Sequence, residues 1–248
     1  ITHMHGDHVL GLPGLFQTMS LLDRERKLEI YGPPGIEAFV EAARRTVQFN
    51  LTFPIEVSDI GDAGLVCEEK EYEVHAAWAD HVIPALAYAL VEKPRPGRFH
   101  PEKAKALGVP EGPFWSRLQR GSAVRLPSGR VVKPRDVMGP SRPGRKIVYT
   151  GDTRPSKSLV SLAEKADLLI HDATFDDELS DKAHEDGHST ASQAAEAARK
   201  ANAKRLVLIH VSARYKVPRT LLEQARNIFS KVDVAEDFMT IDLPFQDV

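Results

Sequence analysis

The chain has 248 residues, enough for one large domain or two small ones, and its formal net charge is −2. Its apolar fraction of 42% is ordinary for a soluble globular protein, and no stretch approaches the roughly 20 apolar residues of a membrane span. The single Cys67 excludes an intramolecular disulfide and fits a reducing cytoplasm. We expect it at a half-buried strand position.

Hydrophobic periodicity predicts strands and helices that alternate along most of the chain. The first half contains a predicted strand at 27–31, a helix at 36–47, and strands at 55–60, 65–67, 72–78 and 85–91. Short helical pieces follow at 102–107 and 113–119. The second half contains predicted strands at 146–149, 168–170 and 206–209, and helices at 157–166, 190–201 and 219–229. Strands interleaved with helices predict a layered α/β domain.

The small net charge hides a strongly basic segment. From Lys93 to Lys146 there are 14 basic residues and three acidic ones, a net charge of +11. The same segment holds nine of the 17 prolines and seven of the 16 glycines. Because cationic side chains release counterions from nucleic acid, contact with a phosphate backbone is one interpretation. A solvated, flexible insertion is the other.

The first eight residues carry a dense cluster of metal-binding side chain types, His3, His5, Asp7 and His8. Alternate residues of an extended backbone point the same way, so His3 and His5 can face one ion. Asp7 and His8 lie beyond the expected bend and can face a second ion. A histidine-rich solvated loop is the alternative.

Three further candidates follow predicted strands, namely His81, Asp152 and His210. Alone, each is typical of a turn or cap residue at a strand end. Together with the opening cluster they form a set of seven, which fits two divalent ions that share one carboxylate. Imidazole and carboxylate ligands without thiolate suit zinc, with manganese as the alternative.

A helix start in the second half supplies another candidate. Thr190 and Gln193 have the spacing of a capping box. His188 therefore lies just before a helix N-terminus, where the helix dipole also favours phosphate. An exposed position before the cap is the alternative for this histidine.

The opening His-x-His-x-Asp-His pattern resembles the signature of the metallo-β-lactamase superfamily. More specifically, five motifs resemble those of the ribonuclease Z family of tRNA 3′-end processing endonucleases. They lie at 2–15, 150–153, 171–174, 188–190 and 210–215. The resemblance extends from residue 1 to about residue 240. The family usually carries several strands before the first motif, so we expect N-terminal strands to be missing here.

The resemblance implies an α/β fold, a metallo-β-lactamase-type αββα sandwich in one domain over 1–248, with a basic arm inserted at 93–125. It implies two zinc ions per subunit, with manganese as the alternative. His3, His5 and His81 would bind one ion, Asp7, His8 and His210 would bind the other, and Asp152 would bridge them. Asp7 would also orient the attacking hydroxide or deprotonate the water from which it forms. His188 would be the general acid, supported by Asp172, which stands where the family usually has Glu.

The activity implied by the resemblance is cleavage of precursor tRNA after the discriminator base by a cytoplasmic homodimer that does not contact a membrane. The insertion between His81 and Asp152 would grip the tRNA body. Candidate phosphate contacts are Lys93, Arg95, Arg98, Lys103, Lys105 and Arg117. Phe114 and Trp115 could stack on bases, or pack the arm against its core.

Two other functions remain open from the sequence. The first is a metallo-β-lactamase-fold hydrolase of small phosphodiesters or esters, which the same ligands would serve. Deletion of 95–105 would separate the two enzymes, since only tRNA cleavage needs the arm. The second is a non-catalytic RNA-binding protein, which zinc content and folding would distinguish.

Overall fold

The computed structural model describes residues 1–245. The chain divides into two compact units. One unit comprises 1–91 and 146–243, and the other comprises 92–145 together with the segment that begins at Pro244. Over the described residues, no helix has the length and apolar character that crossing a membrane requires.

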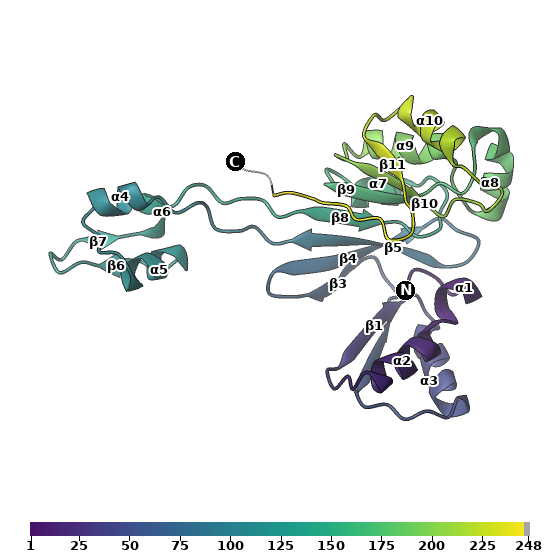
Figure 1. Ribbon diagram of the computed structural model, residues 1–248, viewed down its shortest axis with the longest axis horizontal. Coiled ribbons are helices and arrows are strands. Elements are labelled where there is room, and N and C mark those ends of the chain that lie inside the picture. The colour runs from purple at the N-terminus through teal and green to yellow at the C-terminus, as the bar shows by residue number, and fades with distance from the viewer. Residues whose placement is uncertain (246–248) are drawn as a thin grey trace. The chain divides into compact units, whose positions relative to one another are not determined.

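The first unit is built on a seven-stranded sheet with the strand order β11-β10-β9-β8-β5-β4-β3 (Figure 1). Its strands are β3 (Gly64–Glu68), β4 (Tyr72–Ala79), β5 (Ala85–Glu92), β8 (Lys146–Tyr149), β9 (Leu168–Asp172), β10 (Leu206–Ile209) and β11 (Val232–Val234). Strands β8 to β11 are parallel, whereas β5 pairs with β8 and β3 pairs with β4 in antiparallel fashion. The carboxyl ends of β8, β9 and β10 therefore meet at one edge of the sheet.

A second, two-stranded parallel sheet pairs β1 (Leu28–Gly32) with β2 (Ile55–Asp59). The helices near it are α1 (Gly6–Val9), α2 (Leu12–Leu21) and α3 (Ile36–Thr46). They share a hydrophobic core with β1 that contains Val9, Phe16, Ile30, Ile36 and Val40. Helix α2 was not among the predicted elements. Its first turn contains Pro13, which is tolerated there because the first N–H groups of a helix lack intrahelical partners. A proline normally argues against a helix, so the sequence pattern did not predict this one.

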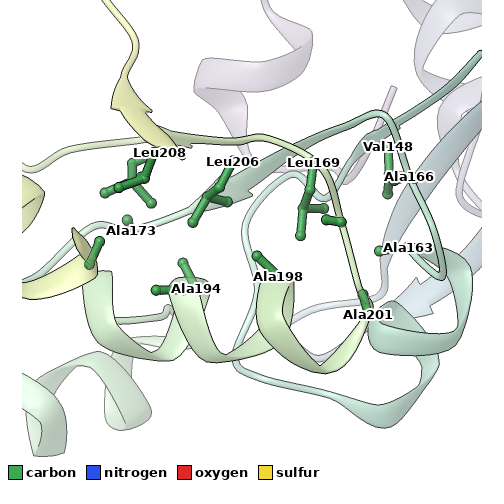
Figure 2. Close-up of a cluster of buried hydrophobic side chains, with 14 of the residues drawn as sticks. Val148, Ala163, Ala166, Leu169, Ala173, Ala194, Ala198, Ala201, Leu206 and Leu208 are labelled. Atoms are coloured by element: carbon green, nitrogen blue, oxygen red, sulfur yellow. The ribbon is translucent and has the colours of Figure 1, made fainter. Parts of the chain in front are cut away.

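Helices α7 (Lys157–Leu162), α9 (Ala191–Lys200) and α10 (Arg219–Arg226) follow the parallel strands. The 3-10 helix η1 (Asp177–Leu179) and helix α8 (Ser180–Asp186) precede α9. In the core, Leu169, Leu206 and Leu208 of the sheet pack against the alanine-rich face of α9 (Figure 2). The predicted helices 157–166 and 219–229 are shorter than expected. Beyond α7 the chain turns, with Lys165 at a φ of 55°, and α10 ends at Arg226.

The second unit has a hydrophobic core of its own. It contains α4 (Pro101–Ala106), α5 (Pro113–Gln119), β6 (Val124–Arg125), β7 (Val131–Val132) and α6 (Pro134–Val137). Its fully buried members include Ala104, Leu118, Val124, Val132 and Val137. The segment predicted as an insertion, 93–125, lies within this unit, which continues to Arg145. The two-residue strands of its hairpin are too short for periodicity to reveal.

Two extended segments at the root of this unit run close together. Isolated bridges join Arg95 to Arg142 and Phe99 to Met138. A Cβ atom on Gly97 would lie 2.0 Å from the carbonyl oxygen of Gly139, so this close approach requires glycine. Some of the prolines and glycines of the basic segment therefore lie in these two paired, extended segments.

Candidate metal centre

The opening motif crosses from an extended segment into a short helix. His3 forms a bridge with Ala85, and the N–H of Leu86 donates to the carbonyl of Thr2 at 2.8 Å. The chain then turns into α1, whose N-cap is His5. His3 and His5 thus precede the bend, while Asp7 and His8 lie on the helix beyond it, as the spacing predicts.

Three imidazoles converge around the δ nitrogen of His5. The Nε2 atom of His3 lies 3.1 Å from His5 Nδ1, and the Nε2 atom of His81 lies 3.3 Å from the same nitrogen. The far nitrogens are held by other groups, since Thr2 Oγ1 lies 3.1 Å from His3 Nδ1 and the carbonyl of Gly187 lies 2.7 Å from His81 Nδ1. A carbonyl oxygen only accepts, so His81 carries its proton on Nδ1 and directs a lone pair from Nε2 toward the cluster.

This cluster fits a divalent ion such as zinc. Zn–N bonds of about 2.0–2.1 Å in a tetrahedron put the ligand nitrogens about 3.3 Å apart, close to the distances found here. Burial, aided by the neighbouring His8, His81 and His5 side chains, lowers the pKa of His3 to about 3. Burial also lowers the pKa of His81. Both rings are therefore neutral at physiological pH, which is the form that binds a metal.

Asp152 lies between this cluster and a second one. Its Oδ2 atom is 3.7 Å from His3 Nε2, 3.6 Å from His8 Nε2 and 3.4 Å from His210 Nε2. Asp7 completes the second cluster, with its Oδ2 atom 3.5 Å from His8 Nε2. Asp152 is only 4% exposed, and a carboxylate buried among imidazoles requires a compensating cation. Within the described residues, the candidate ligands form four overlapping groups, two of which contain Asp152, so this carboxylate can be shared between two ions.

The sheet edge positions Asp152 and His210. Asp152 follows β8 through Gly151, whose φ of 62° and 2.8 Å Cβ approach to Thr2 both demand glycine. His210 directly follows β10 with a φ of 60°, a left-handed conformation that histidine adopts more readily than most residues. Both side chains thereby leave the sheet at the edge where the parallel strands end.

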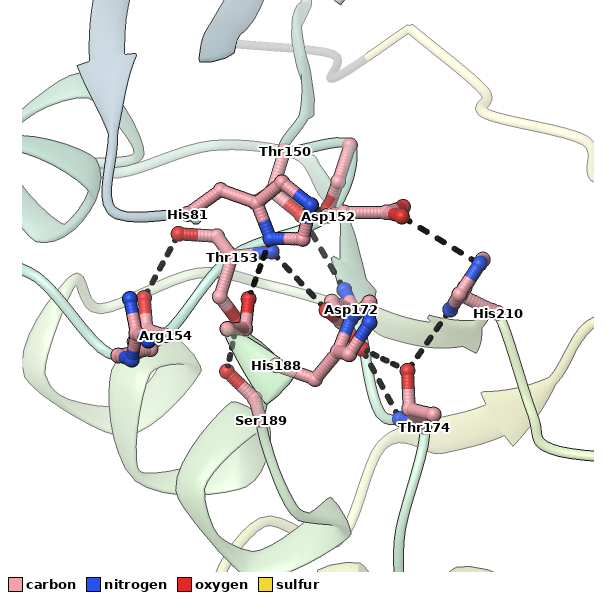
Figure 3. Close-up of polar contacts among 12 residues, drawn as sticks. His81, Thr150, Asp152, Thr153, Arg154, Asp172, Thr174, His188, Ser189 and His210 are labelled. Carbon is pink, nitrogen blue, oxygen red and sulfur yellow. Dashed lines mark hydrogen bonds and ion pairs between the residues drawn. The ribbon is translucent and has the colours of Figure 1, made fainter. Parts of the chain in front are cut away.

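His188 lies beside the second cluster. It comes two residues before Thr190, the N-cap of α9, where the predicted capping box with Gln193 is present. Its ring stacks on that of His210, with centroids 4.9 Å apart and an interplanar angle of 19°. Its Nδ1 atom is 2.8 Å from Oδ2 of the fully buried Asp172. An aspartate at this position therefore reaches the imidazole despite its shorter side chain (Figure 3).

Burial and the neighbouring carboxylates shift the pKa of His188 in opposite directions. Burial disfavours its charged form, but the hydrogen bond and charge of Asp172, with Asp152 and Asp186, raise its pKa above the ordinary value. Since a carboxylate only accepts, the contact fixes a proton on Nδ1. The Nε2 atom is then the position from which His188 can give or take a proton.

The cationic side chains singled out in the sequence differ in exposure. Arg98, Lys103, Lys105 and Arg117 are exposed, whereas Lys93 and Arg95 are half-buried. The guanidinium of Arg95 lies 3.3 Å from the centre of the Phe245 ring. Lys105 Nζ lies 2.7 Å from a carboxylate oxygen of Glu111. Arg95 thus packs at the root of the second unit, and Lys105 has an acidic partner.

Two aromatic residues of the second unit pack against its own core. Phe114 and Trp115 both contact the buried cluster there, and Trp115 Nε1 donates to the carbonyl of Val109 at 3.1 Å. Their packing favours the structural alternative over base stacking. Cys67 is half-buried on β3, as predicted.

Sequence patterns did not indicate which residues orient the candidate ligands. The hydroxyl of Thr2, the carbonyl of Gly187 and the hydroxyl of Thr174 contact His3, His81 and His210 respectively. Thr2 is the only one of these residues that is adjacent to its histidine in the sequence. Adjacency was the only sequence feature that could have indicated such a contact. The other two contacts join residues that are 36 or more positions apart.

Comparisons with known proteins extend this description. A family model described as a beta-lactamase superfamily domain matches residues 119–211. Ribonuclease Z from Methanothermobacter thermautotrophicus is 48% identical over 247 residues, which cover 100% of this chain and 80% of that protein. Ribonuclease Z from Myxococcus xanthus is 47% identical, over 99% of this chain and 80% of its own length. The chain belongs to the ribonuclease Z family.

Solved structures agree with this family and with the predicted fold class. The crystal structure of the short form of human tRNase Z matches with a TM-score of 0.68 and 31% identity, over 99% of this chain and 78% of that chain. The metallo-beta-lactamase fold protein YhfI from Bacillus subtilis matches with a TM-score of 0.61 and 18% identity, over 95% and 73%. The second likeness concerns the fold alone. The α/β metallo-β-lactamase fold predicted from the sequence is confirmed.

Proposed function

We propose that this protein is a metal-dependent endoribonuclease that hydrolyses the phosphodiester 3′ of the discriminator base of precursor tRNA and removes the 3′ trailer. The observation that carries the proposal is the His188–Asp172 pair, 2.8 Å apart, beside two groups of candidate metal ligands in a chain of the ribonuclease Z family. The proposed cofactors are two zinc ions per subunit, with manganese as the alternative. A cytoplasmic location follows from the substrate.

The metal ligands in this proposal divide into three groups. His3, His5 and His81 would hold one ion, Asp7, His8 and His210 would hold the other, and Asp152 would be shared between them. When bound, the ions supply Lewis-acid stabilisation of the phosphoryl oxygens and a water of lowered pKa. Asp7 has a side chain that is 73% exposed, so a carboxylate at the open side of the centre is available to orient the attacking water.

His188 is the proposed general acid. As the bond between phosphorus and the 3′ oxygen breaks, Nε2–H of His188 donates its proton to that oxygen. Asp172 retains the Nδ1 proton and favours the imidazolium. The tRNA product then carries a 3′ hydroxyl and the released trailer carries a 5′ phosphate.

The second unit carries most of the basic segment and is called the basic unit from here on. It is the part of the protein that we propose binds the body of the tRNA. Arg98, Lys103, Lys105 and Arg117 are its exposed candidates, and Lys93 and Arg95 complete the proposed set. Each phosphate contact releases counterions, so substrate binding through this unit weakens steeply as salt increases. A small phosphodiester has no extended phosphate backbone for these side chains to bind, so its hydrolysis should lack this dependence.

A homodimer is also part of the proposal. Leu10, Leu21 and Leu22 on and beside α1 and α2 are 69%, 83% and 77% exposed. These exposed apolar side chains are the proposed contacts of the dimer. Replacement of Leu21 and Leu22 by lysine should convert the dimer to a monomer in size-exclusion chromatography with light scattering. A wild-type protein that is already monomeric would contradict this part of the proposal.

The main test uses precursor tRNA that carries a 3′ trailer. Zinc-loaded protein should release the trailer and leave a 3′ hydroxyl on the tRNA, and chelation should abolish the reaction until zinc is restored. A parallel assay with bis(p-nitrophenyl) phosphate reports the bare phosphodiesterase activity. Hydrolysis of the small substrate without any cut in the precursor would contradict the proposed function and favour a small-molecule phosphodiesterase.

A further inference from the structure

We infer that Thr174 is a positioning residue that commits His210 to bind the second metal ion through Nε2, and that it ties this ligand to the same carboxylate that orients His188. The inference rests on the proposed two-ion site. It assigns a role to a residue outside the proposed set of metal ligands.

The contacts of Asp172 determine which way the Thr174 hydroxyl points. Asp172 is fully buried and is an acceptor only in its ionised form. Its Oδ1 atom accepts from the N–H of Thr174 at 2.9 Å and from the Thr174 hydroxyl at 2.7 Å. Its Oδ2 atom accepts from the N–H of Thr153 at 2.9 Å and faces His188 Nδ1 at 2.8 Å. The single hydroxyl proton of Thr174 is thus directed at Asp172.

The orientation of this hydroxyl selects the tautomer of His210. Thr174 Oγ1 lies 2.8 Å from His210 Nδ1 (Figure 3). Because the hydroxyl proton is directed at Asp172, its oxygen is an acceptor toward His210, and the imidazole donates from Nδ1–H. The lone pair of His210 is therefore on Nε2, the atom that lies 3.4 Å from Asp152 Oδ2. Outer contacts of this kind are known to orient metal-binding histidines.

The backbone holds these two residues beside each other. Beyond the ends of β9 and β10 the pairing continues, since the N–H of Ala173 donates to Ile209 at 2.9 Å and that of Ser212 donates to Thr174 at 3.1 Å. His210 lies between these bonds in its left-handed conformation. Such a conformation is strained in a residue other than glycine and persists where surrounding contacts enforce it. The Thr174 hydroxyl is one such contact.

A chain of hydrogen bonds therefore connects His188 to His210 through Asp172 and Thr174. One buried carboxylate orients both the proposed proton donor and a ligand of the second ion. The ligands of the first ion are oriented by other groups, since His81 contacts the Gly187 carbonyl and His3 contacts Thr2. Loss of the Thr174 hydroxyl should thus affect one metal site selectively.

The test is a zinc titration of the full chain, with bound metal measured by mass spectrometry. Wild-type protein should bind two ions, and Thr174→Val should bind the first unchanged but the second about 10–100-fold more weakly. Thr174→Ser keeps the hydroxyl and should bind both ions as the wild-type protein does. If Thr174→Val still binds the first ion, the variant is folded. If Thr174→Val does not fold, the second-ion affinity of Thr174→Ser still tests the role of the hydroxyl.

The outcomes separate this inference from the proposed function. A wild-type protein that binds fewer than two ions overturns the two-ion site itself. Two ions in the wild type with unchanged second-ion affinity in Thr174→Val overturn the role of Thr174 alone. Loss of the second ion in Thr174→Ser also overturns it, because the hydroxyl is then not the determining group.

Discussion

The metal centre and the basic unit use their polar side chains in opposite ways. At the centre, Asp172 is fully buried and accepts three hydrogen bonds while it faces a fourth potential donor, His188. In the basic unit, Lys103 and Arg117 are exposed cations on separate helices. A buried polar group that loses its partner is costly, whereas an exposed charge is replaceable. Single substitutions should thus have large effects at the centre and small, graded effects in the basic unit.

Asp152→Asn should have the largest effect. It removes the negative charge that the two groups of histidines share, so both ions should bind more weakly and cleavage should fall by more than about 100-fold. Bound zinc and precursor tRNA cleavage would be measured together. Asp181→Asn, which changes an exposed carboxylate on α8, is the matched control. Wild-type zinc content with wild-type cleavage in Asp152→Asn would refute a shared role for this carboxylate.

His188→Ala should separate chemistry from metal binding at the same centre. Loss of a general acid lowers turnover by about 10²–10⁴-fold, while zinc content should stay unchanged. Single-turnover cleavage with saturating protein isolates the chemical step. His184→Ala on α8 removes an exposed histidine and should leave the rate unchanged. If His188→Ala instead strips zinc, His188 is a ligand and not the acid.

Gly187→Ala should weaken the first metal site through the backbone. The glycine has a φ of +85°, and a Cβ atom there would lie 2.6 Å from His81 Nδ1. We expect zinc affinity of the first site to fall by about 10–100-fold, as for loss of other groups that orient ligands. Gly129→Ala has a similar φ of +83° with open space around it, so it controls for backbone strain. Equal effects of the two variants on zinc affinity would show that the contact with His81 is unimportant.

Lys103→Ala and Arg117→Ala test the graded behaviour of the basic unit. Each should raise KM for precursor tRNA several-fold with kcat preserved, and the dependence of log KM on log salt should become shallower by about one for each phosphate that the variant no longer binds. Hydrolysis of bis(p-nitrophenyl) phosphate should not change. The double variant of Arg44 and Arg45, exposed on α3, is the control. A fall in kcat with unchanged salt dependence would speak against phosphate binding by these side chains.

Glu92→Gln should have the smallest effect, confined to the stability of the basic unit. The carboxylate of Glu92 accepts from the backbone and side chain of Arg145, and these hydrogen bonds lower its pKa. Because the folded pKa is below the unfolded value, this stabilisation is complete above pH 4.5 and is lost as pH falls through the folded pKa. The substitution should cost about 1–3 kcal/mol near neutrality, which hydrogen exchange of amides in 92–145 can measure. The exposed Glu164→Gln is the control, and equal protection in both variants would exclude the stabilising contact.

The two units also differ in how much of each could be predicted from the sequence. Strands β8 and β10 in the first unit were predicted with their observed bounds, because each contains a run of apolar residues bounded by polar residues. In the second unit, α5 was predicted with its observed bounds, but the hairpin of β6 and β7 was not predicted. Two-residue strands carry no periodic signal. The strand β11 and the helix α8 were likewise unpredicted.

A similar division applies inside the metal centre. His81, Asp152 and His210 were found as polar residues after apolar strands, and parallel strands bring such ends to one edge. The groups that orient them were not found, because Thr174 and the carbonyl of Gly187 meet their histidines only through tertiary structure. Residue type predicts which side chains could bind a metal. It does not predict which hydrogen bond fixes the tautomer of each ring.

The most direct test of the proposed activity is the position of the cut. Two precursor tRNAs that share a body but differ in trailer sequence and length would be cleaved by the zinc-loaded protein, and their 3′ ends would be mapped to single nucleotides. We predict one cut in each, directly after the discriminator base, at the same position in both. Cuts whose positions follow the trailer sequence, or no cut by protein with two bound ions, would contradict the assignment to tRNA 3′ processing.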